Sequence, residues 1–231
     1  MVPTALMLRI VSLTVCLAGA LLAQESGKFG IFEGASDVGN PSQKGSVAYD
    51  AAKKEYRVTG GGNNMWMNRD DFYFVWKKIS GDVILTADVK LESPGIGHRK
   101  AGLIIRKDLE TGSPYADIMV HGDGLTGLQY REKADDVTRG VRFPISAPTR
   151  IRIERRRNAI TVWAGKEGTP LQELGATDVN LGNPVYVGLA VCPHDDKSSL
   201  TALFSDVMVE ELPSAPGSVP GQKKGGQKKK Q

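Results

Sequence analysis

Apolar and polar residues alternate with a period of two along much of the chain, and helical periodicity is nearly absent. The clearest case begins at Val83, because every second residue from there to Leu91 is apolar, whereas Thr86, Asp88 and Lys90 fall on the other face. This pattern predicts a β-strand with one buried face.

Similar patterns recur between short turn signals, such as Gly60–Gly62, Gly122–Gly124 and Gly182–Pro184. Many short strands with brief connections favour antiparallel pairing, because parallel strands need long crossovers. We therefore expect an all-β, two-sheet antiparallel sandwich. The strands expected are Gly30–Glu33, Ser46–Tyr49, Glu55–Thr59, Asn64–Met67, Phe72–Ile79, Val83–Leu91, Lys100–Arg106, Tyr115–His121, Leu125–Glu132, Arg150–Glu154, Ile160–Val162, Val185–Val191 and Leu200–Glu210.

Several of these runs resemble a known superfamily. The run GGGNNMWMNRDDFYFVWKKISGDVILTADVK (60–90) is similar to the start of a concanavalin A-like lectin/glucanase (jelly-roll) domain, in which an aromatic strand leads through a Gly-Asp turn into an alternating strand. The runs AGLIIR, TRIRIERRRNAITVWAG and PVYVGLAVCPHDD resemble its later strands. Within it, the chain most resembles small exported bacterial domains of unknown function, of the regulation-of-enolase-protein type or associated with TolB-like propellers. The resemblance implies a jelly-roll sandwich that binds ligands on its concave sheet or rim loops.

The two ends differ in composition from this body. Residues 1–23 are typical of a signal peptide, with Arg9 before an uncharged apolar stretch and small residues that favour cleavage after Ala20 or Ala23. An uncleaved anchor is the alternative, although the stretch is short for a membrane span. Residues 213–231 are rich in Pro, Gly, Gln and Lys, which predicts disorder. We thus expect a domain at 24–212 in an exported, periplasmic or extracellular protein with no membrane span after cleavage.

The formal charge of +4 does not describe this domain. Five of the 30 basic residues lie in the tail and Arg9 lies in the leader, so residues 24–212 carry 24 basic and 26 acidic residues. No specific nucleic-acid binding is expected from such a balance. The tail is either a solubilising segment or a contact for anionic polymers through its lysines.

One sheet face gathers the best candidates for a site. If 115–121 and 125–131 form a hairpin around Gly122–Gly124, alternation places the polar residues on one side and Ala116, Ile118 and Val120 in the core. This face is either an ordinary solvated surface or a ligand site, where polar groups bind sugar hydroxyls or a carboxylate and an aromatic side chain stacks on a pyranose ring. Trp66 fits either the rim or an end plug of the sandwich. The candidate ligand-binding residues are Trp66, Arg106, Tyr115, Asp117, His121, Gln129 and Arg131.

Catalytic and metal signals are weak. The paired-carboxylate strand of the glucanases is missing, Asp117 lacks a partner on its face, and Asp70 and Asp71 have the look of turn residues. A stretch from Arg106 to Asp117 partly resembles that of 3-keto-disaccharide hydrolases, with Asp in place of Glu. The three histidines stand far apart in sequence, so no catalytic, cofactor or metal residue is assigned. Cys192 is expected to be a small buried hydrophobe rather than a nucleophile paired with His194.

These features predict an exported, non-catalytic binding module for carbohydrate or another envelope polymer. The alternatives are a glycoside-processing hydrolase that uses Asp117, and a structural module that docks another protein. Glycan binding without turnover, loss of sugar release in Asp117→Asn, or capture of one envelope protein separates the three.

Overall fold

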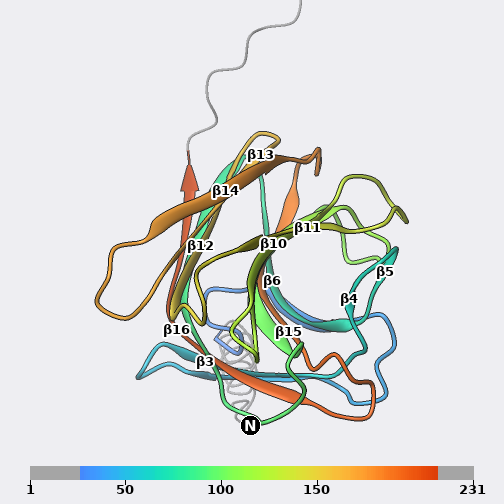
Figure 1. The fold of residues 1–231 in the computed structure, drawn as a ribbon, viewed down its shortest axis with the longest axis vertical. Coiled ribbons are helices and arrows are strands. Elements are labelled where there is room, and N and C mark those ends of the chain that lie inside the picture. The colour runs from blue at the N-terminus through green and yellow to red at the C-terminus, as the bar shows by residue number, and fades with distance from the viewer. Residues whose placement is uncertain (1–26, 213–231) are drawn as a thin grey trace, which may run out of the picture.

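The structure, a computed structural model, describes residues 27–212 as sixteen strands without a helix (Figure 1). All the paired strands are antiparallel and form two sheets of seven strands and one of two. The predicted two-sheet sandwich is confirmed. The predicted signal peptide at 1–23 and the predicted disordered tail at 213–231 lie outside the described residues. Within residues 27–212 no helix is long and apolar enough to cross a membrane.

Sheet A carries the candidate face. In spatial order its strands are β1 (Gly34–Val38), β6 (Phe72–Ile79), β15 (Val185–Cys192), β8 (Lys100–Arg106), β9 (Tyr115–His121), β10 (Thr126–Arg131) and β11 (Arg139–Phe143).

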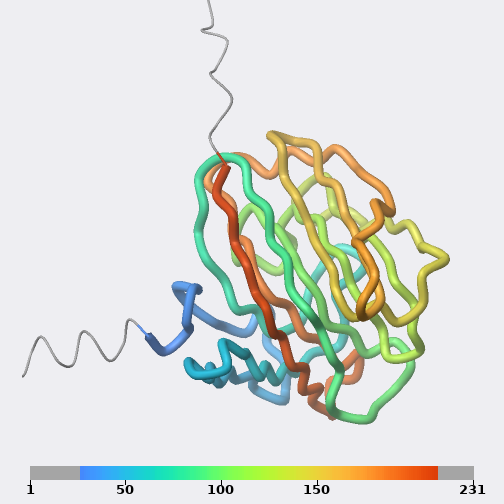
Figure 2. Tube along the Cα trace, turned by 90° about the vertical axis from the view of Figure 1, so that its left-hand side faces the viewer, coloured from blue at the N-terminus to red at the C-terminus, as the bar shows by residue number. Residues whose placement is uncertain are grey.

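Sheet B forms the other large layer, and Figure 2 looks onto it, with the red strand β16 running beside β7. In spatial order its strands are β14 (Gln172–Asp178), β13 (Ala159–Gly165), β12 (Arg150–Arg156), β7 (Asp82–Leu91), β16 (Leu200–Leu212), β3 (Glu55–Gly60) and β2 (Ser46–Asp50).

The core lies between these sheets and follows the predicted alternation. Val83, Leu85 and Ala87 of β7 are buried there, together with Ile118 of β9 and Leu189 of β15. Burial of aliphatic and aromatic side chains at about 25 cal/mol per Å² is the main stabilising force in a domain without a disulfide, and Cys192 is its one cysteine, unpaired and buried.

A small third sheet covers part of the outer face of sheet A. The hairpin of β4 (Met65–Trp66) and β5 (Arg69–Asp70) stands apart from the two large sheets in Figure 1. Its Met65 packs into a second buried cluster with Phe72, Phe74 and Tyr115, away from the main core. The outer face of sheet A, opposite the core, is therefore partly covered.

Some predicted strand limits are wrong. The segment Gly30–Glu33 is mostly turn, because Gly30 has a φ of 59° and lies against the Tyr56 hydroxyl, and the strand begins only at Gly34. The strands β11 and β14 were not predicted. Both are edge strands with mostly exposed side chains, so they lack the alternation that marks a half-buried strand.

Candidate functional site

The hairpin at 115–131 has the predicted register. Asp117 faces Gln129, Tyr115 faces Arg131 and Met119 faces Gly127, so the polar side chains share the outer face of sheet A. Arg106 of β8 stands opposite Tyr115 and adds to the same face.

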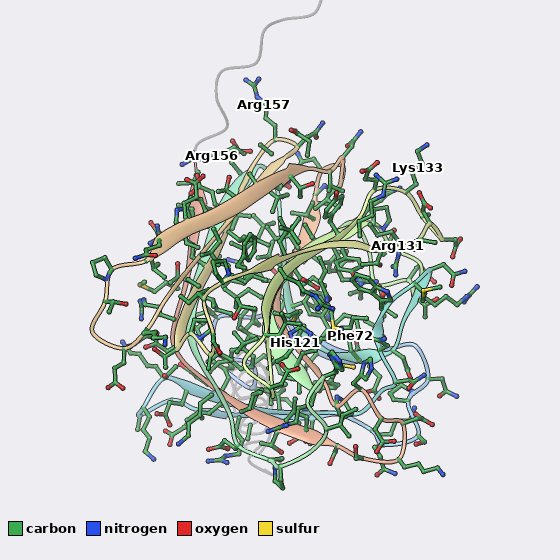
Figure 3. All side chains as sticks on the ribbon, in the orientation of Figure 1. Phe72, His121, Arg131, Lys133, Arg156 and Arg157 are labelled. Carbon is green, nitrogen blue, oxygen red and sulfur yellow. The ribbon has the colours of Figure 1, made fainter. Side chains whose placement is uncertain are left out.

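This face is not the solvated surface that one interpretation of the sequence expected. The side chains of Arg106, Tyr115, Asp117 and Arg131 are fully buried, because the β4–β5 hairpin covers them. In Figure 3 Arg131 lies within the outline of the molecule, whereas Lys133 extends from its periphery. The face is divided into a sealed part and an open part.

The sealed part is held by two buried ion pairs that share Asp70, one with Arg106 and one with Arg131. We call these three residues the arginine clamp. Both oxygens of Asp70 accept hydrogen bonds from Arg131, at 2.7 and 2.8 Å, and one accepts a third from Arg106 at 2.6 Å. Asp70 was expected in a turn, but it belongs to β5 and is 2% exposed. A buried carboxylate with two guanidinium partners satisfies all three groups.

Backbone carbonyls fill the remaining arginine donors. Arg131 donates to the carbonyl oxygens of Met67, Ser113 and Asp136, and Arg106 donates to that of Glu110 at 2.6 Å. The clamp therefore fixes the β4–β5 hairpin on sheet A and leaves neither guanidinium for a ligand.

Tyr115 lies under the clamp. Its hydroxyl contacts the carbonyl oxygen of Met65 at 3.1 Å and the hydroxyl of Thr138 at 3.2 Å, and its ring lies 5.0 Å from the Arg131 guanidinium. Burial raises the pKa of Tyr115 well above its usual value. Tyr115, which was predicted to bind a ligand, is thus a buried residue that packs beneath the arginine clamp.

Asp117 is sealed as well. One oxygen accepts the backbone N–H of Gln129 at 3.2 Å, and the other has no partner. Burial raises the pKa of this carboxyl well above its usual range, although Lys100 acts against the shift. Asp117 does not line the pocket described next, so it is not in a position to meet a ligand there.

The open part is a pocket of about 220 Å³ between the β4–β5 hairpin and strands β10 and β11. At roughly 30 Å³ per water, it holds the volume of about seven water molecules. We call it the histidine pocket. It is lined by Asn64, Trp66, His98, Lys100, His121, Leu125, Gly127, Leu128, Gln129, Gly140, Val141, Arg142 and His194.

His98, His121 and His194, which are far apart in the sequence, lie close together in this pocket. The ring centroid of His98 lies 6.0 Å from that of His121 and 5.6 Å from that of His194. The reason is strand order, because β15, β8 and β9 are neighbours in sheet A. His194, His98 and His121 lie at or just beyond the ends of these three strands, on the same side of the sheet's strand ends. Within residues 27–212 no group of His, Cys, Asp or Glu has the geometry of a metal site.

His121 has a defined tautomer. Its Nδ1 lies 3.1 Å from the carbonyl oxygen of Leu125, so Nδ1 carries the proton and Nε2 is an acceptor. Burial, with the nearby charge of Lys100, lowers the pKa of His121 to about 4. The ring is therefore neutral at pH 7.

Lys100 lies at the base of the pocket and was not predicted as a site residue. It is 3% exposed and pairs with His121 on β9 and Cys192 on β15. Its Nζ donates to Asn64 Oδ1 at 3.0 Å and to Gln129 Oε1 at 3.5 Å. Burial lowers its pKa. The alternation in β8 could have identified Lys100, because it is an even-numbered position like Arg106.

Trp66 lies at the rim. It is half-buried, and its ring covers Gly140 of β11 so closely that a Cβ on Gly140 would lie 3.2 Å from it. Gly127 adds no side chain to the pocket wall.

Cys192 is buried as predicted, and burial raises its pKa to about 11, so it is a thiol rather than a nucleophilic thiolate.

The comparisons with known proteins support the fold. No protein-family model matches the chain, and no curated protein matches it in sequence. Among solved structures, it is similar to a functionally unknown protein from Saccharomyces cerevisiae, with a TM-score of 0.59 and 11% identity over 77% of this chain and 96% of that one. It is also similar to the carbohydrate-binding module CBM66 from Bacillus subtilis, with a TM-score of 0.52 and 14% identity over 78% and 98%.

A third similar structure is a mutant of the GH43 protein BlXynB from Bacillus licheniformis, with a TM-score of 0.57 and 10% identity over 80% of this chain but 39% of that one. The chain thus has the jelly-roll sandwich fold that its sequence predicts, which also occurs in carbohydrate-binding modules. The narrower resemblance to small exported bacterial domains stays a prediction.

Proposed function

We propose that this protein is an exported, non-catalytic carbohydrate-binding module that holds a sugar in the histidine pocket. The observation that carries the proposal is a pocket with an aromatic rim and hydrogen-bonding amides on the outer face of sheet A. Similarity in fold to a carbohydrate-binding module supports it.

The lining supplies the groups that a sugar needs. Trp66 offers an apolar ring for stacking against a pyranose face. The side-chain oxygens of Asn64 and Gln129 accept from Lys100, which leaves both amide nitrogens without an acceptor among residues 27–212. The Nε2 of His121 adds an acceptor for a hydroxyl. Donors, an acceptor and one flat apolar surface are together typical of a sugar site.

The same lining favours binding over hydrolysis. Glycoside hydrolysis requires two carboxyl groups roughly 5–10 Å apart across the scissile bond. The residues that line the pocket, all within the described range, include no Asp or Glu. The hydrolase alternative relied on Asp117, which is buried outside the pocket.

The test is a glycan array probed with the full chain, followed by calorimetric titration of the glycans that bind. Trp66→Ala should weaken binding about tenfold or more, because stacking contributes about 1 kcal/mol beyond the apolar area buried. Gln129→Ala should weaken it by a similar factor through the lost amide contact.

Trp163→Ala is the matched control. Trp163 is also half-buried, but it belongs to β13 of sheet B and does not line the pocket. Its replacement should leave glycan affinity unchanged. A blank array, or an equal loss in Trp66→Ala and Trp163→Ala, would contradict the proposal.

A further inference from the structure

The histidine pocket has a one-sided charge. Its lining contains two cationic side chains, Lys100 and Arg142, and no acidic side chain among the described residues, whereas His121 is neutral at pH 7. Arg142 is exposed, and its guanidinium takes part in no hydrogen bond or ion pair within residues 27–212. The pocket is therefore electropositive.

Lys100 differs from the other buried cations in residues 27–212 because fewer of its N–H donors have an acceptor. Arg106 and Arg131 share Asp70, and Arg155 donates to three backbone carbonyls, those of Gly81, Arg157 and Gly182. Lys100 has two neutral amide oxygens only, one of them at 3.5 Å, and no carboxylate within 4.0 Å. Lys100 thus makes no direct contact with a carboxylate, and the nearest charges that act on it include that of the buried Asp117.

Such an arrangement is costly without a partner. An ammonium ion has three N–H donors, so at least one donor of Lys100 has no acceptor from the chain. Removing an ion from water costs several kcal/mol, which a counter-charge offsets. Lys100 lines the pocket, so a bound anion is able to supply both the missing acceptor and a negative charge in direct contact with the ammonium.

We infer that the pocket takes an acidic saccharide, a sugar of the uronic acid class whose carboxylate pairs with Lys100. This inference rests on the proposed function, because it assigns the chemistry of the sugar held in the same pocket. The volume of about 220 Å³ suits a single sugar ring, with its apolar face on Trp66 and its carboxylate directed to the base of the pocket. Arg142 adds a second positive charge, and the amide nitrogens of Asn64 and Gln129 add neutral donors.

The experiment is a calorimetric titration of the full chain with trisaccharides of galacturonate, glucuronate and mannuronate. Each is compared with its counterpart in which the carboxyl groups are reduced to primary alcohols. At least one acidic trisaccharide should bind about 10 to 100 times more tightly than its reduced counterpart, because hydrogen bonds to charged groups contribute about 1.5–3 kcal/mol. Added salt should weaken that preference.

Lys100→Met should abolish the preference for the acid, and Arg142→Ala, an exposed change that leaves the fold intact, should reduce it several-fold. Lys90→Met is the control, because Lys90 is exposed on β7 of sheet B. Equal affinity for an acid and its reduced form would overturn the inference while the proposed function stands. No binding of either form would overturn both, and an acid preference that persists in both pocket variants would overturn the role of Lys100 and Arg142.

Discussion

The arginine clamp and the histidine pocket lie side by side on the outer face of sheet A, and both bury cationic side chains. In the clamp, Asp70 supplies the counter-charge and backbone carbonyls fill the remaining donors. In the pocket, Lys100 donates hydrogen bonds to two neutral amide oxygens and lines the histidine pocket.

The comparison separates a structural charge from an available one. Arg106 and Arg131 have the residue type expected for binding a carboxylate, but the carboxylate they bind is within the chain. Lys100 has the same capacity and no such partner. Residue type and sheet face alone do not identify a binding residue; the count of satisfied donors does.

The largest effect should come from Asp70→Asn. This change leaves two buried guanidinium groups without a counter-charge and should lower the free energy of unfolding by about 3–5 kcal/mol. Urea unfolding monitored by fluorescence measures it. Asp71→Asn is the neighbouring control: Asp71 is half-buried and makes no ion pair within residues 27–212, so the loss there should stay under about 1 kcal/mol. Similar losses in the two variants would contradict the clamp.

The next effect concerns acid sensitivity in the pocket. Because burial lowers the pKa of His121 to about 4 from about 6.5, the unfolded chain binds this proton first. The contribution of the neutral His121 to the free energy of unfolding is complete above pH 6.5. About 2–3 kcal/mol of it is lost as the pH falls to about 4.

His121→Gln keeps a donor for the Leu125 carbonyl without a titrating group. The difference in unfolding free energy between wild type and variant should shrink as the pH falls from 6.5 to 4. Parallel stability curves for the two proteins would contradict a neutral, buried His121. The raised pKa of Asp117 changes the free energy of unfolding with pH in the opposite direction. This carboxyl is present in the wild type and in the variant, so it does not affect the difference between them.

A smaller effect of opposite sign to that of Asp70 should follow from Lys100→Met. The change removes an unpaired buried ammonium and keeps an unbranched side chain, so in the absence of ligand the free energy of unfolding should stay equal or rise by about 1 kcal/mol. A loss as large as that in Asp70→Asn would mean that Lys100 has a counter-charge within the chain.

The smallest effect should come from Gly140→Ala. The added methyl would lie 3.2 Å from the Trp66 ring, so the ring must shift by a few tenths of an ångström. Glycan affinity should fall a few-fold, with little change in thermal stability. An unchanged affinity would show that the position of Trp66 against β11 does not matter for binding.

The central strands of both sheets and the register of the hairpin at 115–131 followed from alternation, because each core strand has one apolar face. The exposed edge strands β11 and β14 did not. Burial of the polar face did not follow. Alternation shows which residues share a face, but it does not show that a short hairpin such as β4–β5 packs on that face from outside.

The pocket was predictable only in part. Trp66, His121 and Gln129 were identified and line it, whereas Arg106, Tyr115, Asp117 and Arg131 are sealed. Lys100 and the meeting of the three histidines depend on the spatial order of β15, β8 and β9, which a single sequence does not contain.

The most direct test of the division between clamp and pocket is a crystal structure with the tightest-binding uronate trisaccharide. We predict a sugar ring on Trp66 with its carboxylate within hydrogen-bond distance of Lys100 Nζ, and with both arginines still on Asp70. A carboxylate bound instead by Arg106 or Arg131, with the β4–β5 hairpin displaced, would contradict it.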